Sequence, residues 1–358
     1  MSNKVKVNLG KESYDILFSS EFALSIKNHA EKVKSDCLII TQKNIANLFQ
    51  EQFKVLHNID NVFFIYLEDG EKAKSIDSIM KICNFMSEKN FDRSSKIFAV
   101  GGGVVGDISG FAASIFMRGI DYYQYPTTLL AMIDSSVGGK TGINLDKGKN
   151  LVGRIYQPKE VLIDTIFLST LPERQFNAAL AEAIKYGFIY DRDLFFLINN
   201  NIENILQNRS IELIKKIITN CCEIKSDIVS EDVNENELRM ILNFGHTIGH
   251  ALEAYQNYKE LLHGEAIFYG MKCAISISHK KGSLNESEYN TSMEVLNRFN
   301  LPLIKIKDKE KLIALIKNDK KFREKEINFI LLDEIGKAYI SSDIKMNDIE
   351  ESLSCIWG

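Results

Sequence analysis

The sequence predicts two domains of different class: an α/β domain with a mostly parallel sheet, and after it a mainly α-helical domain. Three observations support this prediction. The chain has 358 residues, more than one average domain needs. Up to about residue 165, short apolar runs alternate with amphipathic segments, an order typical of parallel strands joined by helices. After Leu171-Pro172-Glu173 the segments are long and amphipathic, so we place the domains at 1–170 and 171–358.

Three short apolar runs in the first domain have the length and composition of buried strands. They are Cys37–Thr41, Val62–Leu67 and Lys96–Val100. Between them, Asn44–Val55 and Lys72–Glu88 carry apolar residues at the spacing of a helix. The carboxyl ends of parallel strands meet at one edge of a sheet, so we expect a ligand to bind there.

The second domain is predicted to consist mainly of helices. Proline just inside a helix start indicates a first helix at about 173–190. Amphipathic segments predict further helices at about 203–230, 237–257, 264–281, 286–299 and 308–318. Ile327–Leu332 and Ala338–Ile340 have the pattern of a small hairpin, and a last helix follows. We expect the functional site in a cleft between the domains.

The composition excludes several classes of protein. Hydrophobic residues make up 45% and charged residues 26% of the chain, as in globular rather than disordered proteins. The formal net charge of −4 argues against nucleic acid or an anionic membrane as the main partner. The start has no signal-peptide pattern, no segment approaches the roughly 18 apolar residues of a membrane span, and the six cysteines form no CxxC pair. We therefore expect a cytoplasmic protein with reduced thiols.

A glycine-rich segment follows the third predicted strand. Gly101, Gly103 and Gly106 have the spacing of a dinucleotide fingerprint, and a helical pattern follows them. Without side chains in the way, backbone amides and the helix N-terminus can approach a pyrophosphate. Two features depart from the fingerprint: it follows the third strand rather than the first, and no acidic residue ends a strand about 20 positions later. A tight structural turn is the alternative.

A second glycine-containing segment has the ending of a P-loop without its beginning. Gly139, Lys140 and Thr141 fit that motif, but Asp134 stands where a P-loop has its first glycine. Because a carboxylate repels a triphosphate, the segment argues against a P-loop ATPase. Either it is a solvated turn, or it offers polar side chains to another ligand. These side chains are Asp134, Lys140, Asn144, Lys149 and Asn150.

Three of the six histidines fall within 18 residues. His246 and His250 are four residues apart in a helical segment and so share a face, and His263 follows a short loop. Imidazole is a usual ligand of Zn²⁺, and a catalytic zinc ion takes three protein ligands. Spacing alone favours these three histidines, and histidines that cap or fill helix contacts are the alternative. The candidate carboxylates are Glu182, Glu253 and Glu265.

Basic side chains accompany the metal candidates. Lys185 lies one helical turn after Glu182, and Lys225 and Arg239 precede the histidines. Beside a metal they would bind a carboxylate or a phosphate. On a surface they would be ordinary solvated charges.

Five segments, taken in order, resemble the 3-dehydroquinate synthases, a branch of the sugar-phosphate cyclase family. They are GGGVVGDISGFAASIFMRGI, PTTLLAMIDSSVGGKTGIN, AEAIKYG, LNFGHTIGHALE and LHGEA. The resemblance covers nearly the whole chain. It implies a Rossmann-like N-terminal NAD domain, a helical C-terminal metal-binding domain and a homodimer.

The resemblance also implies a reaction and its cofactors. It implies a carbon–oxygen lyase of the shikimate pathway that converts 3-deoxy-D-arabino-heptulosonate 7-phosphate to 3-dehydroquinate and phosphate. The steps are transient oxidation, phosphate elimination, re-reduction, ring opening and intramolecular aldol closure. The cofactors are NAD, recycled within one turnover, and one divalent metal, Zn²⁺ or Co²⁺.

Positions that match the family's motifs give the expected site. The implied metal ligands are Glu182, His246 and His263, so that His250 becomes a substrate or proton-relay group. The implied catalytic positions are Asp134, Lys140, Lys185, Lys225, Arg239, Asn243 and His250. Further implied substrate contacts are Asn150, one of Lys320 and Lys321, and Arg118, the last reaching the neighbouring subunit's site. The implied NAD contacts are Asp69, Gly70, Glu71, Lys74, Gly103, Val104, Val105, Gly106, Asp107, Thr127, Thr128, Lys140, Lys149, Phe167, Leu168, Ser169 and Thr170.

Three alternative functions compete with this interpretation. A related cyclase would make 2-deoxy-scyllo-inosose or a valiolone-type ring, but Lys225 and Arg239 suit a substrate carboxylate. A metal-dependent alcohol dehydrogenase of the glycerol dehydrogenase kind would release NADH. A non-catalytic nucleotide-binding or regulatory subunit would not need the Glu182, His246 and His263 set.

Overall fold

The computed structural model describes residues 4–33, 35–145, 148–232, 238–317 and 328–356. The chain forms two compact units. The first unit comprises Met1–Pro172 together with Lys225–Ser230, and the second comprises Glu173–Ile224 together with Glu231–Gly358.

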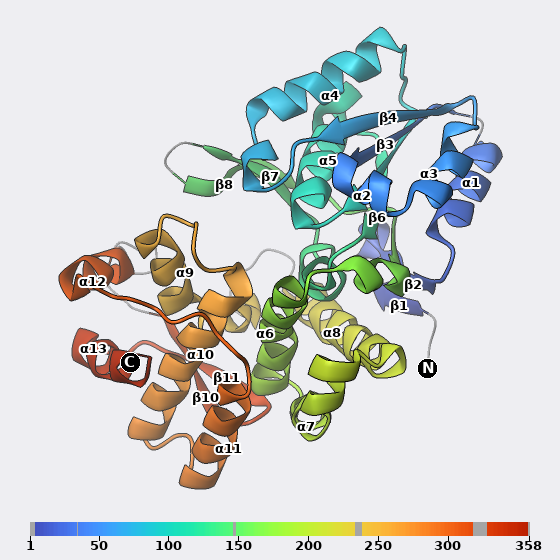
Figure 1. Ribbon diagram of the computed structural model, residues 1–358. Helices are drawn as coiled ribbons and strands as arrows, with labels where there is room; N and C mark the ends of the chain where they lie inside the picture. The colour runs from blue at the N-terminus through green and yellow to red at the C-terminus, as the bar shows by residue number, and fades with distance from the viewer. Residues whose placement is uncertain (1–3, 34, 146–147, 233–237, 318–327, 357–358) are drawn as a thin grey trace. The chain divides into compact units, whose positions relative to one another are not determined.

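The first unit is built on one sheet (Figure 1). Within the described residues this sheet has seven strands in the order β1-β2-β9-β6-β5-β3-β4, and all neighbours are parallel except β1 and β2. The strands are β1 (Lys4–Val7), β2 (Tyr14–Ser19), β3 (Cys37–Gln42), β4 (Val62–Leu67), β5 (Lys96–Gly101), β6 (Asp121–Pro126) and β9 (Glu160–Asp164). A separate antiparallel hairpin consists of β7 (Lys140–Leu145) and β8 (Gly148–Ile155).

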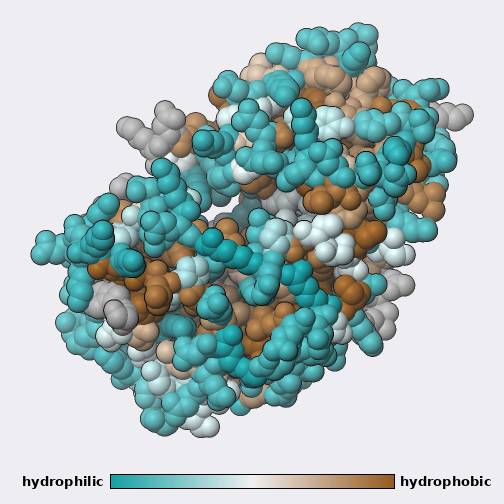
Figure 2. Space-filling view, in the orientation of Figure 1, coloured by the Kyte–Doolittle hydropathy of each residue, from teal (hydrophilic) through white to brown (hydrophobic). Residues whose placement is uncertain are grey.

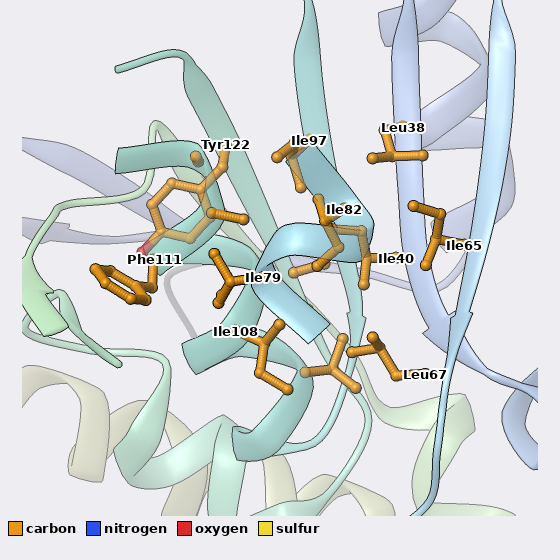
Figure 3. Packing of buried hydrophobic residues seen from close by; sticks show 14 of the residues in the cluster. Leu38, Ile40, Ile65, Leu67, Ile79, Ile82, Ile97, Ile108, Phe111 and Tyr122 are labelled. Atoms are coloured by element: carbon orange, nitrogen blue, oxygen red, sulfur yellow. The ribbon is translucent and has the colours of Figure 1, made fainter. Parts of the chain in front are cut away.

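Helices cover both faces of this sheet because its central strands are apolar on both sides. Leu38 and Ile40 of β3 point toward α4 (Ile76–Glu88) and α5 (Gly103–Ile115), where they join a buried cluster (Figure 3). On the other face lie α1 (Phe22–Val33) and α3 (Gln50–His57). His29 of α1 contacts the ring of Phe98 in β5, and Phe53 of α3 contacts that of Phe64 in β4. The predicted α/β class is therefore confirmed.

The predicted strands are present, but two helix boundaries were wrong. The helix expected at 44–55 is broken into α2 (Lys43–Leu48) and α3, because Phe49 between them turns into the core against Phe22 and Phe167. The helix expected from Lys72 begins at Ile76, where the Ser75 hydroxyl accepts a hydrogen bond from the Ser78 amide as its N-cap.

The second unit is mainly helical, as predicted. Its helices are α6 (Glu173–Ile189), α7 (Arg192–Asn200), α8 (Ile211–Glu231), α9 (His246–Tyr255), α10 (His263–Lys280), α11 (Glu286–Asn297), α12 (Lys309–Lys317) and α13 (Met346–Ser352). The last part of α8 belongs by its contacts to the first unit. Helix α10 packs against α6, α9, α11 and α13, and against the hairpin of β10 (Phe329–Glu334) and β11 (Lys337–Ser341).

Two predictions for the second unit were also wrong. The sequence missed α7, and the helix expected at 203–230 is interrupted by a left-handed backbone at Arg209, with a π-helical turn at Asn204–Asn208 before it and α8 from Ile211 after it. The single helix expected at 237–257 is interrupted at Gly245, whose φ is +77°. A side chain there would also lie 2.8 Å from the backbone nitrogen of Met271 in α10. Glycine therefore lets the chain turn beside α10, and α9 begins at His246.

On the face drawn in Figure 2 the surface is mostly hydrophilic, with smaller hydrophobic areas. Among the helices of the described segments, none combines the length and the apolar composition that crossing a membrane requires.

Candidate active site

Three helices of the second unit bring together one carboxylate and two imidazoles. Glu182 lies in α6, His246 is the first residue of α9, and His263 is the first residue of α10. The Nε2 atoms of both histidines lie 3.7 Å from Oε1 of Glu182. One ligand atom from each of the three side chains lies within 4.8 Å of the others, so this cluster could hold a metal ion.

The state of the Glu182 carboxylate fits a metal. Its side chain is 1% exposed, and Oε1 is buried without a hydrogen-bond partner among the described residues. Its other oxygen, Oε2, accepts a hydrogen bond from Nζ of buried Lys185. A buried carboxylate oxygen that faces two imidazole nitrogens and is otherwise unpartnered is suited to a cation. One carboxylate and two imidazoles form a donor set that suits Zn²⁺ or Co²⁺ and leaves a position open.

The far side of each imidazole ring is held by the protein. Nδ1 of His246 lies 3.1 Å from the carbonyl oxygen of Phe244, and Nδ1 of His263 lies 3.3 Å from Oε2 of Glu253. Such contacts orient a ligating ring and keep Nε2 toward the metal. Burial lowers the pKa of His246 well below its usual range, so this ring is neutral at pH 7. Burial also acts to lower the pKa of His263, but the hydrogen bond to Glu253 and the charge of Glu182 raise it overall.

The remaining metal candidates are placed differently. His250 is exposed, and its ring centre lies 5.2 Å from that of His246. His250 forms a second group with Glu253 and His263, whereas the three histidines favoured by spacing form no group by themselves among the described residues. Glu265 is buried, and its two oxygens accept hydrogen bonds from Arg174 and from the backbone of Leu262.

In the first unit, the NAD candidates follow the carboxyl ends of parallel strands, except Lys140 and Lys149, which lie in the β7–β8 hairpin. Asp69–Lys74 follows β4, Gly103–Asp107 follows β5, Thr127 and Thr128 follow β6, and Phe167–Thr170 follows β9. The sheet reverses its strand order between β3 and β5, and the glycine-rich turn lies at that point. Ligands of open α/β sheets bind at such a switch point. Gln42 at the end of β3 and Asn44 after it lie on the same edge of the sheet. The sequence analysis named neither of them as a site residue.

The glycine-rich turn leaves the N-terminus of α5 open. Gly102 is the N-cap and has no side chain that could accept a hydrogen bond from the first helical amides. A Cβ on Gly103 would lie 2.9 Å from Oγ of Ser135, so a larger residue would displace its neighbour. These amides and the partial positive charge of the helix suit a pyrophosphate.

A buried polar group lies beside this turn. Nζ of Lys74 donates a 2.6 Å hydrogen bond to Asp107 and another to the amide oxygen of Asn150. Burial raises the pKa of Asp107 to about 6, although the charge of Lys74 opposes the shift. Asn144 connects the same region, since its side chain donates to Glu71 and accepts from the amide of Asn150.

Other candidates of the first unit differ in exposure. Nζ of Lys225 donates to a carboxylate oxygen of Asp134 at 2.6 Å and to the carbonyl of the same residue at 2.8 Å. Lys140, Lys149 and Arg118 are exposed. The buried candidates of this unit are Lys74, Val105, Gly106, Thr127, Phe167, Leu168 and Lys225, whereas Asp69, Gly70, Glu71, Ser169 and Thr170 are exposed.

In the second unit, Lys185 and Arg239 are buried cations, 2% and 4% exposed. The side-chain amide of Asn243 donates to the carbonyl of Met240. Lys320 and Lys321 lie outside the described residues. Arg174 was not predicted as a site residue, because no motif or spacing pointed to it. It binds Glu265, which lies two positions after His263.

Solved structures that match the whole chain define its class. A 2-epi-5-epi-valiolone synthase from Streptomyces hygroscopicus subsp. jinggangensis with bound NAD⁺ and Zn²⁺ is 28% identical, with a TM-score of 0.87 over 98% of each chain. A 2-deoxy-scyllo-inosose synthase complexed with carbaglucose-6-phosphate, NAD⁺ and Co²⁺ is 26% identical, with a TM-score of 0.88 over 98% of this chain and 99% of the other. Fold and site thus define a protein of the sugar-phosphate cyclase class.

Sequence relatives narrow this class to one family. Residues 64–178 match the model described as 3-dehydroquinate synthase N-terminal, and residues 179–322 match the model described as 3-dehydroquinate synthase C-terminal. A 3-dehydroquinate synthase from Shewanella pealeana is 41% identical over 99% of this chain and 100% of its own length. The chain belongs to the 3-dehydroquinate synthase family, and it is a carbon–oxygen lyase that acts on phosphates.

Proposed function

We propose that this chain converts 3-deoxy-D-arabino-heptulosonate 7-phosphate to 3-dehydroquinate and phosphate, a step of the shikimate pathway. The observation that carries the proposal is the unpartnered Oε1 of buried Glu182, which faces Nε2 of His246 and of His263 within a chain that matches the family over its full length.

Glu182, His246 and His263 would hold one Zn²⁺ or Co²⁺ ion, and the residues at the switch-point edge would hold NAD. When bound, NAD supplies a reversible hydride acceptor and the metal supplies a Lewis acid. The fit is supported by the open N-terminus of α5 and by the donor set of the cluster. Lys74 and Asp107 would position the nucleotide, because their ion pair, in which Lys74 is buried and Asp107 partly exposed, lies beside that N-terminus.

The other residues of the site act on a substrate that is rich in negative charge. Lys140, Lys185, Lys225 and Arg239 would bind its carboxylate and phosphate and stabilise charge that develops during elimination. Asp134 holds Lys225 in position through their ion pair. His250, exposed beside the cluster, would accept or donate hydrogen bonds at a substrate hydroxyl and relay its proton. In this scheme the substrate's own phosphate takes up the proton in the elimination step.

The protein would act as a homodimer in which Arg118 reaches the partner's site. Arg118 is exposed, has a left-handed backbone with φ +68°, and makes no hydrogen bond or ion pair with any described residue. Apolar side chains nearby are also exposed: Ile115 and Met117 precede it, and Leu145, Leu151 and Ile155 lie on the β7–β8 hairpin that packs against α5. Such exposed apolar groups are typical of an interface. The six cysteines are free thiols, which suits a cytoplasmic enzyme.

The proposal is tested by measuring phosphate release from the seven-carbon substrate with NAD⁺ and Zn²⁺ or Co²⁺, while absorbance reports NADH. We expect stoichiometric phosphate without accumulating NADH. Accumulating NADH would identify a dehydrogenase instead. Absence of both signals, followed by turnover of an inosose- or valiolone-type substrate, would assign the chain to another branch of the cyclases.

A further inference from the structure

The first turn of α10 carries three consecutive residues with three different contacts. His263 faces Glu182, Gly264 meets the backbone of α6, and Glu265 binds Arg174. Successive helical residues are rotated by about 100°, so His263 and Glu265 project about 200° apart, to nearly opposite sides of α10. Gly264 lies between them. A Cβ on it would clash with the carbonyl group of Ala178, which shows that the two helices cross there in backbone contact.

The facing residues of α6 form one stripe. Arg174, Ala178 and Glu182 follow one another at intervals of four residues, which places them along one side of the helix. Ala178 meets Gly264 at the crossing, with Arg174 on one side of it and Glu182 on the other. The crossing therefore divides two contacts between the same helices: the metal cluster on one side and the ion pair between Arg174 and Glu265 on the other.

That ion pair is built for orientation rather than for charge alone. Nε and Nη2 of Arg174 donate to the two oxygens of Glu265 at 2.7 and 2.8 Å, a bidentate arrangement. Nη2 also donates to the carbonyl of Glu260, and Glu265 accepts a hydrogen bond from the amide of Leu262. The Glu265 side chain is 5% exposed, so its two oxygens are held by these donors and not by bulk water. The pair thus connects α6 to the loop and first turn that carry His263.

We propose that Arg174 and Glu265 are positioning residues which, with the Gly264–Ala178 crossing as the pivot, set where His263 lies relative to Glu182 and so determine metal affinity. This inference rests on the proposed ligand set. Without the pair, α10 can rotate or slide about the crossing, and Nε2 of His263 moves relative to Oε1 of Glu182. Groups that orient metal ligands in this way change metal affinity by about ten- to 100-fold when they are removed.

The test compares R174M and E265Q with wild type in the full-length protein. E265Q keeps the size of the side chain and still accepts the hydrogen bond from Leu262, whereas R174M keeps an unbranched apolar stem and removes the guanidinium group. The matched control is R192M: Arg192 is 47% exposed against 54% for Arg174, and it likewise binds a carboxylate, Glu288, and a carbonyl, Ile335. Co²⁺ affinity is measured by competition with a chelator, and the visible Co²⁺ spectrum reports ligand geometry.

We expect R174M and E265Q each to bind Co²⁺ at least tenfold more weakly with an altered spectrum, and R192M to match wild type. The double variant should lose little more than either single variant, because the two side chains act as one unit. Unchanged affinity and spectrum in R174M and E265Q, even with a lowered melting temperature, would show a merely structural pair and overturn the inference. An H263A variant distinguishes an error in the ligand set from an error in the positioning role. If H263A keeps its metal, the ligand set is wrong. If H263A loses the metal while R174M and E265Q bind it as wild type does, only the positioning role is wrong.

Discussion

Replacing Lys185 by methionine should destabilise the metal-free protein and strengthen metal binding at the same time. Lys185 and Glu182 are 2% and 1% exposed and form an ion pair inside the second unit. Methionine keeps the volume of the side chain but removes the ammonium group. The buried carboxylate of Glu182 then has only the imidazoles of His246 and His263 beside it. Removing one partner of a buried ion pair costs about 3–5 kcal/mol.

The bound metal should cancel much of this loss, because a divalent cation at the same carboxylate replaces the missing positive charge. If it restores only half of a 3 kcal/mol loss, metal affinity rises about tenfold, since roughly 1.4 kcal/mol corresponds to a factor of ten. A loss of 3 kcal/mol should lower the melting temperature of the metal-free variant by roughly 6–12 °C relative to wild type if the second unit unfolds cooperatively. With bound metal, the difference in melting temperature between K185M and wild type should be smaller.

The assay records thermal unfolding with excess chelator and with excess Zn²⁺, together with chelator competition at fixed pH. K280M is the matched control, because Lys280 pairs with Glu351 in the same unit but both side chains are half-exposed, so its effect should be below about 1 kcal/mol. The reasoning that Lys185 and the metal share one carboxylate would be refuted by either of two results. In the first, metal-free K185M is as stable as metal-free wild type. In the second, metal raises the melting temperature of K185M by no more than it raises that of wild type.

Three further predictions follow from the site. H263A should lose bound metal while NAD still binds, as measured by metal analysis and NAD titration; full metal content would contradict the ligand assignment. R118A should be inactive alone and regain about a quarter of wild-type activity when subunits are mixed with K185M, because random pairing restores one site in half of the dimers; no recovery in any mixture would exclude the cross-subunit role. For Asp107, burial raises the pKa to about 6, against the charge of Lys74, from an ordinary value of 3.8. The folded state therefore binds this proton more tightly, and the stabilisation present below pH 4 is lost as the pH rises through 6. Relative to wild type, D107N should accordingly become more stable between pH 4 and 7, by up to about 3 kcal/mol in urea unfolding; a constant difference would contradict the raised pKa.

The sequence predicted those elements whose stabilising contacts leave a local pattern. β3, β4 and β5 are continuous apolar runs because they are buried on both faces. The sequence missed the other four strands of this sheet: β1, with its alternation of lysine and valine at a sheet edge, β2, β6, and β9, which lies between β2 and β6. The position of β9 is set by its pairing with β2 and β6, which come from distant parts of the chain.

The site shows the same division. Helical spacing drew attention to His246 and His250, since an i, i+4 pair shares a face in any helix, and nearness in sequence added His263. Spacing therefore gave His250 the same weight as the two histidines that face Glu182. The structure begins α9 at His246, after the left-handed Gly245, so this imidazole lies at a helix end beside α6 and α10. The packing of Gly245 against Met271 that positions it is tertiary, and no local pattern encodes it.

A stronger local signal for the candidate metal site was available in α6. From Phe176 to Ile189 this helix is buried nearly all round, and Glu182 and Lys185 are its only charged residues in that stretch. A helix that is apolar on every side belongs in a core, where each unpaired charge is strongly unfavourable. Replacing such a pair by apolar residues is often neutral or stabilising, so stability alone does not account for keeping it. Two opposite charges at i, i+3 in an otherwise apolar helix therefore indicate a function for the carboxylate. The unpartnered Oε1 of Glu182, turned toward two imidazoles rather than toward Lys185, is consistent with that function being metal binding.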